Sequence, residues 1–147
     1  MTQTMTGGCA CGRIRYSAEI ANDEAYLCHC RMCQRATGGV SVAFKNLPKA
    51  AVRWETEPDY YASSPIARRG HCAQCGTSLS FDYPDSEKMD LTIGSFDRPA
   101  RFRPKHHFGA EGMHRAWIDT SQLPEVRTQD HKALVDRWVK TTGALPD

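Results

Sequence analysis

Seven cysteines stand in three tight groups, and they are the residues whose type and spacing suit chemistry. The groups are Cys9-Ala10-Cys11, Cys28-His29-Cys30-Arg31-Met32-Cys33 and Cys72-Ala73-Gln74-Cys75. An odd number of cysteines cannot all pair within one chain, and a Cys-x-Cys segment rarely reaches disulfide geometry. Zinc accepts four thiolates in a closed structural site, or three thiolates with one position left open for a reacting group. Seven divides as four plus three, which predicts two zinc ions per chain, one for folding and one for chemistry.

Spacing alone leaves two ways of sharing the ligands. An ordinary zinc ribbon joins the pair Cys30 and Cys33 to the third group, although the gap between them exceeds the roughly 15–20 residues of a compact ribbon. The other arrangement joins the first group to the third and leaves the second group as a three-thiolate site. This arrangement is attractive because one local segment carries all three ligands. Residues i and i+2 of an extended strand also point to the same side, as Cys28 and Cys30 would.

Length and composition bound the protein class. The chain has 147 residues, enough for one domain with its own core. Its 19 basic and 17 acidic residues give a net charge of +2, which argues against a nucleic-acid partner. No apolar run approaches the roughly 20 residues of a membrane span, and the first residues lack the apolar segment of a secretory signal. Reduced, metal-binding cysteines without an export signal favour a cytoplasmic protein.

The elements that must position the cysteines read as short strands. Residues 1–7 offer little to bury and are expected to form a disordered tail, followed by a single domain over 8–147. Alternating apolar residues and frequent turn signals predict strands at 13–20, 25–28, 40–44, 51–55, 60–63, 77–83 and 90–96. This pattern favours a mainly β fold of antiparallel sheets.

One helix is predicted near the C-terminus, from about residue 130 to residue 142. Leu134 pairs with Trp138 and Val135 with Val139 at i,i+4 spacing, and Gly143 is placed to end the helix. We expect its apolar stripe to pack on the sheet.

The order of the cysteine groups resembles that of a known family. The matching segments are Gly8-Cys9-x-Cys11-Gly12, Cys28-His29-Cys30-x-x-Cys33-x-x-x-x-Gly38, Cys72-x-x-Cys75-Gly76, Gly94-Ser95-Phe96-Asp97, Pro104-x-x-His107-Phe108, and Trp117 followed by Leu123-Pro124. With them the chain is similar, from about residue 7 to residue 125, to the glutathione-dependent formaldehyde-activating enzymes. The same domain also occurs in centromere protein V.

The resemblance implies a fold, a ligand set and a reaction. The fold would be a zinc-organised, β-tent-like domain of twisted antiparallel sheets. A structural zinc would be held by Cys9, Cys11, Cys72 and Cys75, and a catalytic zinc by Cys28, Cys30 and Cys33. The reaction would be carbon–sulfur lyase chemistry that forms or cleaves S-(hydroxymethyl)glutathione. A different class remains open, namely a non-catalytic, zinc-stabilised binding module of the same fold.

An open zinc suits a small-molecule thiol, with glutathione as the default, because metal coordination favours the thiolate. Glutathione is anionic, so its pocket should supply cations, and Arg31 and Arg35 flank Cys33 as candidate carboxylate contacts. Further candidates are Arg13, Lys45, Arg68 and Arg69. Two histidines also stand out: His71 beside a ligand cysteine, and His107, expected to be a buried structural residue.

Overall fold

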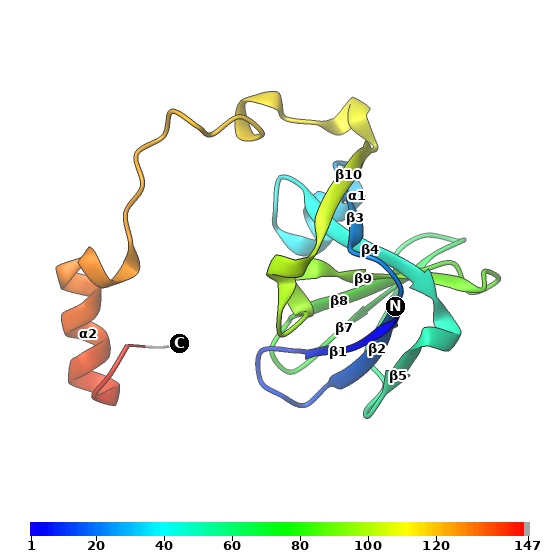
Figure 1. Cartoon of the computed structure of the whole chain (residues 1–147), viewed down its shortest axis with the longest axis horizontal. Helices are drawn as coiled ribbons and strands as arrows, with labels where there is room; N and C mark the ends of the chain where they lie inside the picture. The colour runs from blue at the N-terminus through cyan, green and yellow to red at the C-terminus, as the bar shows by residue number, and fades with distance from the viewer. Residues whose placement is uncertain (146–147) are drawn as a thin grey trace. The chain divides into compact units, whose positions relative to one another are not determined.

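The computed structural model of the chain describes residues 1–145, and Figure 1 shows their helices and strands. The chain divides into two compact units. The first unit is Met1–His114, and the second begins at Arg115. The first unit holds all seven cysteines and both sheets. The β unit therefore carries all the candidate metal ligands, and the single domain over 8–147 stays a prediction.

The smaller sheet has three antiparallel strands, in the order β1 (Gln3–Gly8), β2 (Arg15–Ile20) and β5 (Val52–Trp54). The prediction of a disordered tail over residues 1–7 is wrong, because β1 pairs with β2 residue by residue. Met5 lies buried in the core, and Gly7 leaves room for Tyr16, whose hydroxyl would be 2.4 Å from a Cβ at that position. Burial of Met5 and the close packing of Gly7 on Tyr16 thus allow an otherwise polar segment to form a strand of the sheet.

The larger sheet has seven strands, which are the remaining strands of the first unit. Its order is β10 (Arg103–Phe108), β3 (Glu24–Cys28), β4 (Val42–Pro48), β9 (Lys88–Thr92), β8 (Ser78–Asp82), β7 (Arg68–His71) and β6 (Asp59–Ala62). Neighbours are antiparallel except for β10, which runs parallel to β3 and departs from the all-antiparallel prediction. Strands β7 and β10 were not predicted. The mainly β class is confirmed.

The main core lies between the two sheets. Tyr16 and Ile20 of the small sheet meet Leu79 and Leu91 of the large sheet in one buried cluster, which also includes Cys72. A smaller cluster of Cys28, Cys33, Val42 and Phe44 lies on the opposite face of the large sheet, under the short helix α1 (Arg31–Thr37). The chain therefore has two apolar environments, and each of them contains cysteines.

The C-terminal unit contains the helix α2 (Lys132–Thr142), which confirms the predicted helix. Gly143 ends it in the left-handed conformation, with its N–H donating to the carbonyl of Val139. Packing of its apolar stripe on the sheet stays a prediction. Short 3₁₀ turns lie at Lys49–Ala51, Ile93–Ser95, Pro99–Arg101, Ala110–Gly112, Arg115–Trp117 and Thr128–Asp130. No helix within residues 1–145 is long and apolar enough to cross a membrane.

Candidate metal centres and the adjoining cavity

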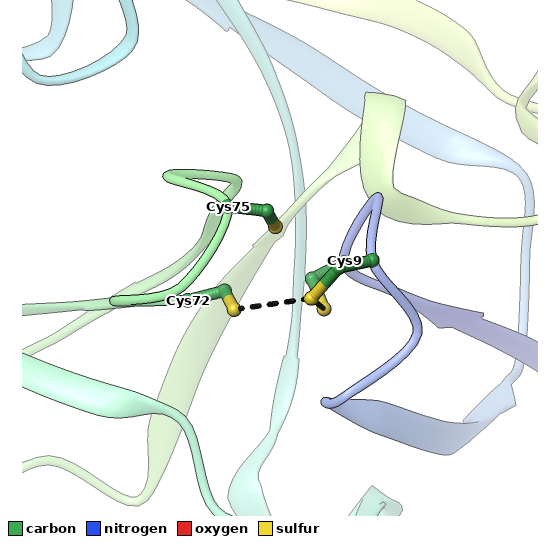
Figure 2. Close-up of side chains that lie close together, drawn as sticks. Cys9, Cys72 and Cys75 are labelled. Atoms are coloured by element: carbon green, nitrogen blue, oxygen red, sulfur yellow. Dashed lines mark hydrogen bonds between the residues drawn. The ribbon is translucent and has the colours of Figure 1, made fainter.

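The first candidate metal centre joins two turns from different sheets. Cys9 and Cys11 lie in the turn between β1 and β2, and Cys72 and Cys75 lie in the turn between β7 and β8. Figure 2 shows the labelled side chains of Cys9, Cys72 and Cys75 approaching one another from these two turns. The four sulfurs all lie within 4.8 Å of one another. This four-cysteine cluster corresponds to the second of the two arrangements left open by the spacing, and the structure does not group the cysteines of residues 1–145 as a zinc ribbon.

Both turns are shaped by glycine and by a shared threonine. Gly12 and Gly76 adopt φ values of 81° and 79°, the left-handed region that favours glycine. Thr77 Oγ1 accepts a hydrogen bond from the N–H of Ala10 and lies 3.2 Å from the sulfur of Cys75. One side chain therefore ties the first turn to the second.

The donor set of this cluster fits zinc. The Cys9 and Cys11 sulfurs are 3.5 Å apart, and the Cys11 and Cys72 sulfurs are 3.7 Å apart. A tetrahedral site with zinc–sulfur bonds of about 2.3 Å requires sulfur–sulfur separations of about 3.8 Å. All seven cysteines are free thiols, so no disulfide competes for these sulfurs.

The second candidate metal centre is the three-cysteine cluster of Cys28, Cys30 and Cys33, whose sulfurs also lie within 4.8 Å of one another. Cys28 ends β3, Cys30 is the N-cap of α1, and Cys33 lies in the first turn of that helix. The sulfur of Cys30 accepts a hydrogen bond from the N–H of Cys33, at 3.3 Å. Strand end and helix start thus bring three thiols to one point, with fewer ligands than a closed zinc site needs.

A segment from the far end of the first unit packs against this cluster. The N–H of His29 donates to the carbonyl of Phe108, at 2.9 Å. The buried amide of Gln34 donates to the carbonyls of His29 and Gly112, at 2.9 and 3.0 Å. A Cβ on Gly112 would lie 2.4 Å from the His29 carbonyl oxygen, so only glycine allows this approach. Both backbone groups of His29, its N–H and its carbonyl, are therefore hydrogen-bonded, and these bonds fix the loop that carries the cysteines.

Two histidines join the same segments. His29 is fully buried, and its Nε2 lies 2.8 Å from Nδ1 of His107 on β10. Burial and the neighbouring His107 lower the pKa of His29, which favours a neutral ring. The expectation that His107 is buried is wrong, since its residue is exposed and His29 is the buried partner.

A buried arginine contacts the three-cysteine cluster. The guanidinium of Arg69, on β7, donates to the sulfur of Cys33 at 3.4 Å and lies over the ring of Phe81. Hydrogen bonding with Cys28, together with the bond from Arg69, lowers the pKa of Cys33 to about 5 even though burial opposes this shift. The pKa of Cys28 shifts in the opposite direction, so Cys33 is the more readily deprotonated of these two thiols.

A cavity of about 550 Å³ adjoins the cluster on this side. Met32 and Arg35 of α1 form one wall, and Arg69 and His71 of β7 form another, with Tyr61 of β6 beside them. Arg69 lines the cavity and also contacts Cys33, so its side chain connects the cavity with the cluster, although none of the three cysteines lines the cavity itself. Its polar lining is cationic rather than acidic.

Comparison with known proteins places this geometry in a family. The family model described as glutathione-dependent formaldehyde-activating enzyme, abbreviated GFA, matches residues 4–111. The chain belongs to the GFA family. The matched region contains both cysteine clusters and the cavity, and it ends close to the boundary of the first unit.

Two similar proteins accompany this match. A protein of Schizosaccharomyces pombe described as an uncharacterized lyase is 33% identical over 81 residues, which cover 55% of this chain and 59% of the relative. The match therefore spans less than two thirds of the relative's length. A crystal structure of a Rhodobacter sphaeroides protein superimposes with a TM-score of 0.52 at 20% identity, over 63% of this chain and 88% of that one. The second likeness shows the fold alone.

Within the GFA domain, the two clusters are suited to two zinc ions per chain, as the sequence predicted. Of the two arginines predicted to contact glutathione, Arg35 lines the cavity, whereas Arg31 donates to the side chain of Gln34. Sequence reasoning missed Gln34 and Gly112, because an isolated Gln or Gly carries no signal of the contacts it will make.

Proposed function

We propose that this GFA domain is a zinc-dependent carbon–sulfur lyase-type enzyme that forms or cleaves a thiol–aldehyde adduct. S-(hydroxymethyl)glutathione is the substrate that the family name suggests. Cleavage of this adduct breaks its carbon–sulfur bond and removes the hydroxyl proton, and the sulfur regains a proton. The products are formaldehyde and glutathione. The observation that carries the proposal is a three-thiol metal centre beside a cationic cavity.

The three-cysteine cluster supports a catalytic role because it offers three ligands where a closed site has four. Zinc held by Cys28, Cys30 and Cys33 would supply an open position and favour the thiolate form of a substrate sulfur. The chain's own contribution is rigidity, since Gln34 and the glycine segment at residues 109–112 fix the loop that carries the ligands. A fixed cluster keeps the reacting sulfur in one place.

The cavity supports a substrate of the size and charge of a small anionic peptide thiol. Its volume of about 550 Å³ falls in the range of about 300–1,000 Å³ for small-molecule sites. Arg35 is exposed at its edge and can bind a substrate carboxylate, while Met32 and Tyr61 offer apolar surface. We assign the carboxylate contact to Arg35 rather than Arg31, whose guanidinium is engaged by Gln34.

The reaction is tested by exchange NMR spectroscopy on glutathione, formaldehyde and their adduct at equilibrium. Zinc-loaded protein should speed the exchange above the rate in buffer, and Cys30→Ser should return it to the buffer rate. Glutathione that binds at the cavity without faster exchange would overturn the lyase proposal and leave the binding module. Wild type that neither binds glutathione nor speeds the exchange would remove both.

The carboxylate contact is tested by three arginine variants. Arg35→Gln should raise the KM for glutathione about 3–10-fold, because it removes one charge-assisted hydrogen bond that is weakened by exposure to solvent. Arg53→Gln, on the exposed side of β5, is the matched control and should leave KM unchanged. A larger effect of Arg31→Gln than of Arg35→Gln would overturn the assignment of the contact to this cavity.

A further inference from the structure

Arg69 is a buried cation whose hydrogen-bond partner is a metal-ligand sulfur. Its residue is only 6% exposed, and its guanidinium donates to the sulfur of Cys33 at 3.4 Å. Its Nε is buried and has no acceptor, and Arg69 forms no salt bridge with any carboxylate in residues 1–145. A buried guanidinium without a counter-charge costs several kcal/mol, so this position requires an anion nearby.

Two other arginines show that Arg69 differs from them in having no carboxylate partner within residues 1–145. Arg68, the preceding residue, points to the opposite face of the strand and is paired with the carboxylate of Asp82, which Lys49 also contacts. Arg13 also interacts with a cluster thiol, that of Cys72 in the four-cysteine cluster, but it is paired with the carboxylate of Asp59 as well. In both cases a carboxylate contacts the guanidinium. The acidic group within hydrogen-bond distance of Arg69 is the thiol of Cys33. The buried carboxyl group of Asp90 also interacts with Cys33, but it accepts a hydrogen bond from Asn46 and forms no salt bridge with Arg69.

The charges then balance. Three thiolates and one divalent zinc ion carry a net charge of −1, and the guanidinium of Arg69 brings the group to zero. The sulfur that receives the hydrogen bond is also held in orientation, because Arg69 is fixed by its strand and by the ring of Phe81, 4.9 Å from its guanidinium carbon. Outer partners of this kind tune metal sites by fixing their ligands and by adjusting local charge.

We propose that Arg69 is the charge partner of the three-cysteine metal centre and sets the zinc affinity of that centre through Cys33. It is a positioning residue, not a ligand of the metal. The proposal deepens the proposed function and rests on the part of it that places zinc at this cluster. It also revises the sequence-based suggestion that Arg69 binds a substrate carboxylate, because its charge is already used by the thiolates.

The test measures zinc affinity directly, by competition with a chromophoric chelator and without substrate. Wild type should release zinc in two steps, and Cys30→Ser identifies the step that belongs to the three-cysteine centre. Arg69→Gln should weaken that step by about 10–100-fold, the usual effect of losing an outer partner, and leave the other step unchanged. Arg69→Lys keeps the charge but loses the planar fork, so it should show a smaller loss.

Arg68→Gln is the matched control, since it removes an arginine of the same strand from the other face and should leave both zinc affinities unchanged. Cobalt substitution adds a spectroscopic reading, because Arg69→Gln should shift the thiolate-to-cobalt band of the three-cysteine centre only. Unchanged affinity in Arg69→Gln, or an equal loss at both centres, would overturn the proposal. If Arg69→Gln does not fold, Arg69→Lys is judged by the same two criteria. Failure of the lyase reaction would leave these affinities unaffected.

Discussion

Cys72→Ser should destabilise the first unit more than Cys30→Ser, because the two metal centres close loops of very different length. The four-cysteine cluster links turns of both sheets, and Cys11 and Cys72 are 61 residues apart. The three-cysteine cluster lies within residues 28–33. In the chain-entropy relation for a cross-link, the long loop is worth about 4 kcal/mol and the short loop about 2 kcal/mol. Cys72 is also fully buried in the main core.

The difference is large enough to measure. At roughly 4 °C per kcal/mol for a unit of this size, Cys72→Ser should lower the Tm by roughly 16 °C and Cys30→Ser by roughly 8 °C. The assay is thermal unfolding followed by circular dichroism, on protein reconstituted with zinc. The same variants in excess chelator are the control, because the contribution of the metal is then absent from all of them. Equal losses of Tm in the two zinc-loaded variants would refute the division between a structural and an open centre.

Three further predictions concern metal content, pH and packing. Elemental analysis after zinc is added back should give two zinc ions per wild-type chain and one for Cys30→Ser; one in wild type would contradict the two-centre assignment. Hydrogen bonds from an arginine and a threonine lower the pKa of Asp97 to about 2. Its stabilisation should therefore be complete above about pH 4 and be lost as the pH falls toward 2. Its side chain is 43% exposed, so the free energies of unfolding of wild type and Asp97→Asn should differ by less than about 1 kcal/mol. The ion pair would be contradicted if this difference stayed constant as the pH is lowered. Gly112→Ala should cost about 1–3 kcal/mol of unfolding free energy in denaturant titrations, because its Cβ would meet the His29 carbonyl. Gly94→Ala, with open space at its Cβ, should cost far less; equal costs would contradict the tight packing.

The parts of the structure that could be predicted from sequence are those with a local signal. Alternating apolar residues in β2 and the i,i+4 pairs of α2 reveal their elements directly. Gly143 ends α2 as expected. Spacing alone left two ways of grouping the cysteines, and the structure brings the first group together with the third.

The parts that could not be predicted depend on contacts between distant residues. Strand β10 has the charged sequence RPKHHF, and it is a strand because β3 offers its free edge. Helix α1 spans seven residues without an apolar repeat, and it is set by the sulfur of Cys30 at its start and by Gly38 at its end. Arg69 reads as a surface residue in sequence, since nothing local indicates that a thiol will replace water around its guanidinium.

The unequal spacing of the two clusters also has a consequence for the order in which metal is loaded during synthesis. The three thiols of the second group are complete once residue 33 has been made, and they can capture zinc before any sheet exists. The four thiols of the other centre come together only after residue 75 has been made and both sheets have met. Zinc captured early is bound by the unfolded chain as well as the folded one, so it contributes less to the driving force for folding than zinc that binds only the folded chain. Zinc that binds last holds the finished fold closed.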